Sequence, residues 1–169
     1  MEDAQKAFEV IHKILHTVPL EKVMNHPVVT IYQDQDFSVV EELFTKKKIR
    51  HMPVVDRNDK IVGVISQKDV YRHIAPRRSP DGEVFFKEGI IRDEDGFYEK
   101  DSLNQYILNV VMRKDPFVLS KNHSLGEAIH AMVLHKISCV PIVDDDKHAI
   151  GIVTRLDVLK LVDLFYANR

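Results

Sequence analysis

Two short segments, GVISQKD and GIVTRLD, each place a hydroxyl side chain three residues before an aspartate. Ser66 precedes Asp69 in the first segment, and Thr154 precedes Asp157 in the second. A hydroxyl residue at a helix start stands beside backbone N–H groups that lack intrahelical partners, and such a helix end attracts phosphate. An aspartate in the first helical turn can accept hydrogen bonds from the two vicinal hydroxyls of a ribose. The residue types and their spacing are therefore compatible with a nucleotide site.

The same spacing also describes a capping box, in which Ser or Thr and an acidic residue three positions later satisfy the first N–H groups of a helix. Many helices with this motif bind nothing. The presence of two copies does not separate the two interpretations, because duplication copies a cap as faithfully as a binding site. The spacing alone leaves both open.

The two segments belong to an internal repeat, since residue 63 plus 88 is residue 151 and the same shift aligns other positions. A unit of about 52 residues therefore occurs twice, at residues 23–74 and 111–162. The positions that the shift aligns are mostly apolar residues and turn residues: Val23 with Val111, Met24 with Met112, Ile49 with Ile137, Pro53 with Pro141, Asp56 with Asp144 and Val70 with Val158.

Each copy predicts the element order β-α-β-β-α, with its first helix beginning at a capping residue, Asp36 in one copy and Ser124 in the other. A unit this small has difficulty burying both its strands and its helices alone. We therefore expect an α+β fold in which the two repeats pack about a pseudo-twofold axis, so that equivalent loops share a cleft.

The remaining segments flank the repeats. Residues 1–22 carry Phe8, Ile11, Ile14 and Leu15 at helical spacing, which predicts an N-terminal helix packed on the repeats. Residues 75–105 form a linker or insert, for which we expect a solvated linker and keep a small β-hairpin over the cleft as the alternative. The predicted domains are thus the helix, a first repeat at 23–74, the insert, and a second repeat at 106–165.

Composition excludes several classes of function. The 24 basic residues against 26 acidic ones give a net charge of -2, so no general attraction to nucleic acid or anionic membranes is expected. No apolar run approaches the roughly 20 residues that span a bilayer, so we expect no direct membrane insertion. Cys139 is the single cysteine, and the N-terminus lacks the features of a secretory signal, which together predict a cytoplasmic protein.

The sequence predicts no metal site. His12 and His16 stand four residues apart, a spacing that can hold a metal, but no third ligand is evident nearby.

The segments VVTI, IRHMPVVD and GVISQKD, followed by ISCVPIVD and GIVTRLD, together resemble tandem CBS domains, the pair also called a Bateman module. The resemblance covers both repeats. It implies a paired module, often a homodimer, that senses adenosine-containing ligands and regulates an attached or partner protein. Such modules bind AMP, ADP, ATP or S-adenosylmethionine as regulatory ligands and need no obligatory cofactor.

The resemblance also implies roles for particular residues. The ribose-binding aspartate falls on Asp69 and Asp157, and the hydroxyl on the phosphate side falls on Ser66 and Thr154. Other positions that approach the ligand in the family are a first-strand residue and the residues around a hydrophobic-proline pair: Thr30, Arg50, His51, Met52 and Pro53 in the first copy, and Val118, Ser138, Cys139 and Pro141 in the second.

The two copies differ at these positions. Arg50 can make charge-assisted hydrogen bonds to a phosphate, whereas Ser138 in the second copy cannot. We therefore expect the first site to favour a charged nucleotide and the second to be weaker, adenosine-like or empty, unless Arg155 supplies a cation to either site. His51 could make phosphate binding pH-dependent, and an exposed histidine at a strand edge is the alternative.

The sequence thus predicts a regulatory module without catalytic activity, because Asp69 and Asp157 recur as equivalents rather than as an acid and a base in unlike environments. A nucleotide would act on a partner that the sequence does not identify by shifting the relative orientation of the repeats. The alternative from another class is a dimerisation or scaffold module whose capping boxes are only caps.

Overall fold

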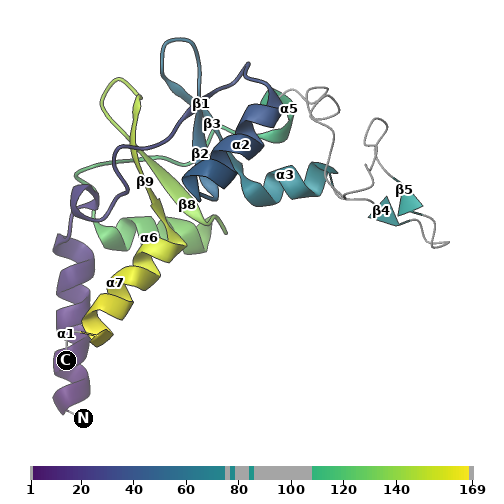
Figure 1. Ribbon diagram of the computed structural model, residues 1–169. Helices are drawn as coiled ribbons and strands as arrows, with labels where there is room; N and C mark the ends of the chain where they lie inside the picture. The colour runs from purple at the N-terminus through teal and green to yellow at the C-terminus, as the bar shows by residue number, and fades with distance from the viewer. Residues whose placement is uncertain (1, 75–76, 79–83, 86–107, 168–169) are drawn as a thin grey trace. The chain divides into compact units, whose positions relative to one another are not determined.

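Two compact units make up the chain in the computed structural model, which describes residues 2–74, 77–78, 84–85 and 108–167 (Figure 1). The first-repeat unit is Val29–Asp115, and the second-repeat unit combines Met1–Val28 with Pro116–Arg169. Each repeat has the predicted order β-α-β-β-α, and the α+β fold with an N-terminal helix is confirmed.

The first-repeat unit is built on a four-stranded sheet with strand order β1-β2-β3-β6. Strand β1 is parallel to β2, while β2 with β3 and β3 with β6 are antiparallel. Apolar side chains of α2, β2 and β3 form the core, with Phe37, Met52 and Ile65 fully buried. The elements are β1 (Ile31–Tyr32), α2 (Phe37–Lys47), β2 (His51–Val55), β3 (Ile61–Ser66), α3 (Gln67–Ile74), α5 (Leu108–Val111) and β6 (Arg113–Lys114).

The second-repeat unit contains a three-stranded sheet with strand order β7-β8-β9. Strand β7 is parallel to β8, and β8 is antiparallel to β9. Val140, Ile142 and Val153 are buried at its centre. The elements are α1 (Glu2–Thr17), the 3-10 helix η1 (Leu20–Lys22), β7 (Leu119–Ser120), α6 (Leu125–Leu134), β8 (Cys139–Val143), β9 (Ala149–Thr154) and α7 (Arg155–Ala167).

Local sequence signals explain where the helices start. Ser124 caps α6 with a complete capping box, in which its side chain accepts a hydrogen bond from the Glu127 backbone N–H and the Glu127 carboxylate accepts one from the Ser124 N–H. These hydrogen bonds from Ser124 lower the pKa of Glu127. Asp36 occupies the N-cap position of α2, but its side chain makes no cap hydrogen bond.

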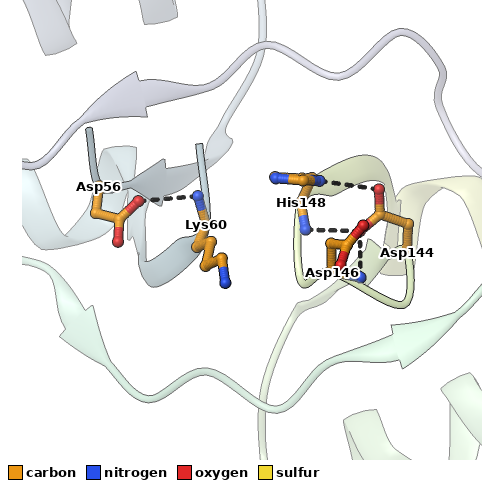
Figure 2. Close-up of polar contacts among 5 residues, drawn as sticks. All are labelled: Asp56, Lys60, Asp144, Asp146 and His148. Carbon is orange, nitrogen blue, oxygen red and sulfur yellow. Dashed lines mark hydrogen bonds and ion pairs between the residues drawn. The ribbon is translucent and has the colours of Figure 1, made fainter. Parts of the chain in front are cut away.

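Aspartates shape the turns between the paired strands, as Figure 2 shows. Asp56 Oδ1 accepts the backbone N–H groups of Asn58 and Lys60, at 2.8 and 3.0 Å. The equivalent Asp144 accepts those of Asp146 and His148, at 3.0 and 2.8 Å, and its Oδ2 lies 3.1 Å from the His148 ring. An aspartate that satisfies its own turn explains the acidic run at 144–146 without a bound cation.

The segment that opens each sequence repeat packs into the unit of the other repeat. We call residues 20–25 and 108–113 the exchanged segments. Leu20 is fully buried in the core of the second-repeat unit, and Leu108, 88 positions later, is fully buried in the core of the first. The backbone of Asn25 pairs with Ile152, and that of Arg113 pairs with Val64.

Glycine permits this close approach. A Cβ atom on Gly63 would lie 2.6 Å from Met112 Sδ and 3.0 Å from the Arg113 carbonyl oxygen. A Cβ on Gly151 would likewise collide with Met24, with Cγ at 3.0 Å. The glycine that begins each GVIS or GIVT run is therefore required by a neighbouring methionine rather than by backbone conformation.

One expectation for the N-terminal helix needs correction. The C-terminal half of α1 packs on α6, where a Cβ on Gly126 would lie 2.8 Å from the Leu15 carbonyl oxygen, but Phe8 and Ile11 remain 63% and 56% exposed. Helical spacing identifies an apolar face without showing how much of it a neighbour covers. In the insert, β4 (Arg77–Arg78) and β5 (Val84–Phe85) pair as antiparallel strands, a feature of the hairpin alternative. The rest of the insert prediction lies outside the described residues.

Candidate functional site

The first candidate site lies where β3 runs directly into α3 in the first-repeat unit (Figure 1). Ser66 ends the strand and Asp69 lies in the first helical turn, and both side chains are buried. Asp69 Oδ2 accepts hydrogen bonds from the Ser66 backbone N–H at 3.1 Å and from its hydroxyl at 2.5 Å. The Asp69 N–H in turn donates to Ser66 Oγ at 3.2 Å. The capping box is therefore formed, and it fixes the orientation of the carboxylate.

Strand β2 brings other predicted residues to this junction. His51 is half-buried and pairs in register with Ser66, and the carbonyl of the exposed Arg50 accepts the Gln67 N–H at 3.0 Å. Strand β1 pairs only with Val54 and Val55 of β2, so it does not extend to His51, and the alternative of a strand-edge histidine stays open. Thr30, half-buried, immediately precedes the β1 residue that pairs with Val54 of β2.

The hydrophobic-proline residues have a different environment. Met52 is fully buried in the core and Pro53 is also buried, so their side chains pack inside the unit. Pro141 is buried in the same way in the second repeat. Their predicted contact with a ligand stays a prediction.

Arg113 contacts the first candidate site, and the sequence analysis did not predict this contact. Its guanidinium Nη2 lies 3.6 Å from Asp69 Oδ1, and its side chain is 51% exposed. Arg113 comes from an exchanged segment, so it is 44 positions from Asp69 along the chain. The available signal was the repeat itself, because Asn25 and Arg113 both directly follow a Val-Met pair.

The second candidate site lies at the junction of β9 and α7 in the second-repeat unit (Figure 1). Asp157 Oδ2 accepts hydrogen bonds from the Thr154 N–H at 2.8 Å and from its hydroxyl at 2.6 Å. The Asn25 amide of the exchanged segment donates to the same oxygen at 2.7 Å. Thr154 and Asp157 are half-buried, so this junction is more open than its counterpart.

The other predicted residues of the second copy surround this junction. Cys139 is buried and pairs in register with Thr154, and the Ser138 carbonyl accepts the Arg155 N–H at 3.0 Å. The Arg155 guanidinium donates to the Ile137 carbonyl oxygen at 3.2 and 2.9 Å, so this side chain caps a neighbouring loop. Val118, half-buried, directly precedes β7.

These arrangements can bind vicinal hydroxyls but offer little else. Each junction presents one oriented carboxylate next to a helix start, which suits a ribose with a phosphate beyond it. Within the described residues, no group of three or more His, Cys, Asp or Glu side chains could hold a metal ion. In the same part of the chain, no helix has the length and apolar character needed to cross a membrane.

Comparison with known sequences gives the family. The sequence model of the CBS domain matches residues 20–76 and 108–164. The chain is 32% identical to an uncharacterised protein of Methanocaldococcus jannaschii, MJ1426, over 83% of this chain and 89% of that protein. It is also 26% identical to the inosine-5′-monophosphate dehydrogenase of the same organism, but spans only 25% of that enzyme's length.

Comparison with solved structures supports the fold. The CBS domain pair of protein MJ0100, in complex with 5′-methylthioadenosine and S-adenosyl-L-methionine, superposes with a TM-score of 0.65 at 20% identity, covering 86% of this chain and 99% of that one. CBSX2 in complex with AMP superposes with a TM-score of 0.64 at 20% identity, covering 88% and 98%. At this level of identity the likeness establishes the fold, and the ligands belong to those proteins.

Proposed function

Because the chain belongs to the CBS-domain family, with two CBS domains, we propose that it is a non-catalytic regulatory module that binds adenosine-containing ligands. The observation that carries the proposal is the hydroxyl-aspartate pair at the strand-to-helix junction of both repeats, where each carboxylate is already oriented. Structures of the same fold contain AMP, S-adenosylmethionine and 5′-methylthioadenosine. The ligand would be regulatory, and no obligatory cofactor is required.

The carboxylate geometry suits a ribose. An ionised carboxylate offers about four acceptor positions on its two oxygens. All three hydrogen bonds described for Asp157 end on Oδ2, which leaves Oδ1 for a ribose hydroxyl. The cap and the ligand can therefore share one carboxylate, with the cap holding it in place.

The first site is proposed to take a phosphorylated ligand such as AMP, ADP or ATP. Arg50 directly precedes β2, and its backbone carbonyl accepts the N–H of Gln67, the first residue of α3, so its side chain is long enough to reach that helix end. The N-terminal end of a helix and a guanidinium both favour phosphate. The second copy has Ser138 at the equivalent position, which accords with a weaker or phosphate-free ligand.

Regulation requires that the ligand distinguish two states of the protein. A ligand with equal affinity for both states shifts no equilibrium. We therefore propose that ligand binding changes the relative orientation of the repeats, and that a partner protein or a second copy of this chain recognises the change. A cytoplasmic location accords with the single cysteine.

Thermal unfolding with added ligands tests the proposal. Adenosine, AMP, ADP, ATP, S-adenosylmethionine and 5′-methylthioadenosine would each be titrated against the full chain. A true ligand at about 100 times its dissociation constant should stabilise the fold by about 2.7 kcal/mol. If none of these compounds raises the melting temperature, the sensing function is refuted.

Variants assign the sites. Asp69→Asn and Asp157→Asn each keep one side-chain oxygen for the cap but lose the charged acceptor that a ribose diol needs. Each should abolish the ligand-induced stabilisation at its own site while leaving the unliganded protein folded. Asp163→Asn is the matched control, since Asp163 is an exposed aspartate of α7. Loss of binding in the control as well would argue against assignment to the junctions.

A second candidate function is dimerisation or scaffolding without a nucleotide, and the outer face of α7 favours it. Leu159, Val162 and Tyr166 are 63%, 60% and 72% exposed and recur at helical spacing. Exposed apolar faces of this kind mark protein interfaces, and a second copy of the chain is the proposed occupant. A monomer by analytical ultracentrifugation at micromolar concentration would remove this support.

A further inference from the structure

The residue that follows each Val-Met pair contacts the aspartate of the other sequence repeat. Arg113 Nη2 lies 3.6 Å from Asp69 Oδ1, and Asn25 Nδ2 lies 2.7 Å from Asp157 Oδ2. Arg113 is 88 positions after Asn25, just as Asp157 is 88 positions after Asp69, so the two contacts are equivalent. The same pair of positions is thus in contact in both repeats, but the group that contacts the aspartate is a guanidinium in one and an amide in the other.

This change alters the charge at the two carboxylates. At Asp69 the guanidinium of Arg113 opposes the carboxylate, and the pair has no net charge. At Asp157 the partner is a neutral amide, and among the described residues no ion pair involves this carboxylate. The nearby Arg155 directs its guanidinium to the Ile137 carbonyl oxygen instead.

The Arg113 contact is loose enough to change partners. A strong guanidinium-carboxylate hydrogen bond measures about 2.7–2.9 Å, and the distance of 3.6 Å is longer. Ion pairs with an exposed member contribute about 0–1 kcal/mol to stability. Arg113 could therefore turn from Asp69 toward a ligand phosphate at little energetic cost, while Ser66 keeps the carboxylate in position.

We propose that the residue after the Val-Met pair sets the charge preference of each site. Arg113 directs the first-repeat site to phosphorylated adenosine ligands, because its positive charge offsets the negative charge of Asp69, which would otherwise repel a phosphate. Asn25 leaves the charge of Asp157 in place and directs the second-repeat site to uncharged or cationic ligands, such as adenosine, a thioether nucleoside or a sulfonium nucleoside. The inference rests on the proposed function, since it concerns the selectivity of the same two sites.

Reciprocal substitutions test the inference, with each site measured alone. Asp157→Asn silences the second site, so Arg113→Asn is measured in that background by calorimetric titration with adenosine and AMP. The AMP preference, defined as the ratio of the adenosine dissociation constant to the AMP dissociation constant, should fall about tenfold, or about 1.4 kcal/mol. In the Asp69→Asn background, Asn25→Arg should raise the same ratio at the second site by a similar factor.

Lys114→Asn is the matched control for Arg113→Asn. It removes the same charge one residue further along β6, where the side chain points to the opposite face of the strand. This control should leave the AMP preference within about twofold of the parent, where twofold corresponds to about 0.4 kcal/mol. Salt adds a second readout, because AMP affinity should fall less steeply between low and high ionic strength in Arg113→Asn than in the parent or in Lys114→Asn.

The outcomes separate the inference from the function. If the parent proteins bind adenosine and AMP but neither Arg113→Asn nor Asn25→Arg changes the preference, the inference is wrong and the proposed function stands. A loss of affinity that is equal for both probes would show a structural role and would also overturn it. If the wild type binds neither probe, both proposals fail together.

Discussion

Replacing Gly63 or Gly151 by alanine tests whether the opening segments are exchanged between the repeats. A Cβ on Gly63 would lie 2.6 Å from Met112 Sδ and 3.0 Å from the Arg113 carbonyl oxygen. The methionine tip can move, but the carbonyl is backbone. Overpacking of this kind costs about 1–3 kcal/mol, and the reduced flexibility of the unfolded chain returns about 0.4–1 kcal/mol. We therefore expect Gly63→Ala to lower the free energy of unfolding by about 1–2 kcal/mol.

Double-mutant cycles identify the colliding partner. In a Met112→Ala background, two of the three close contacts of the new Cβ are gone, so Gly63→Ala should cost at least 1 kcal/mol less than in the wild type, about the size expected for contacting residues. The same holds for Gly151→Ala in a Met24→Ala background, since all the close contacts described for that Cβ are with Met24. The crossed pairs, Gly63 with Met24 and Gly151 with Met112, should be additive within about 0.5 kcal/mol.

Chemical denaturation at 25 °C gives these energies, and the melting temperature should follow at about 2–4 °C per kcal/mol for a chain of this size. Met112→Ala itself should be costly, about 2–5 kcal/mol, because Met112 is buried. If the double variants are only marginally stable, urea is the better denaturant, because the free energy of unfolding falls less steeply with its concentration than with guanidinium chloride. Coupling of Gly63 with Met24 instead of Met112 would show that each repeat keeps its own opening segment, and would refute the exchange.

Two further predictions concern single residues outside the sites. The backbone N–H of His148 is the main cause of the lowered pKa of Asp144, so this carboxylate stabilises the fold above about pH 4 and loses that effect as the pH falls through its lower folded pKa. Asp144→Asn should therefore reduce the melting temperature at pH 7 but not at pH 2, and an equal reduction at both would contradict the reasoning. Lys136 has a φ of 53°, in the left-handed region that costs a non-glycine residue about 1–2 kcal/mol. Lys136→Gly should raise the free energy of unfolding by about 1 kcal/mol, whereas the control Lys47→Gly, inside the last turn of α2, should lower it by about the same amount.

Local signals made much of the fold predictable. The capping residue Ser124, the turn aspartate Asp144 and the spacing of apolar residues each act within a few positions of the chain, so the element order follows from the sequence. The repeat presents each of these local patterns twice, so every element is indicated by two segments of the chain. The packing of the repeats about a pseudo-twofold axis and the ligand contacts of the site residues stay predictions.

Contacts between distant segments were not predictable in the same way. The pairing of β3 with β6 joins residues about 50 positions apart, and no local rule selects β6 over another short segment as the partner of β3. Arg113 and Asn25 were missed for this reason, although the repeat aligned them. The exposure of Phe8 and Ile11 has a related cause, because an apolar face in a helix does not specify what covers it.

The hydroxyl-aspartate pair is both a cap and a candidate site, and the structure shows why these roles do not compete. The cap hydrogen bonds of Asp157 end on one carboxylate oxygen and fix the direction of the other. A carboxylate held in this way loses little conformational entropy when a ribose binds, which favours affinity. Alanine at Asp69 or Asp157 would remove the cap and the proposed ligand contact together, and the two effects would be confounded. Asparagine separates them, since it keeps an oxygen for the cap and removes the charge that the proposed ribose contact uses.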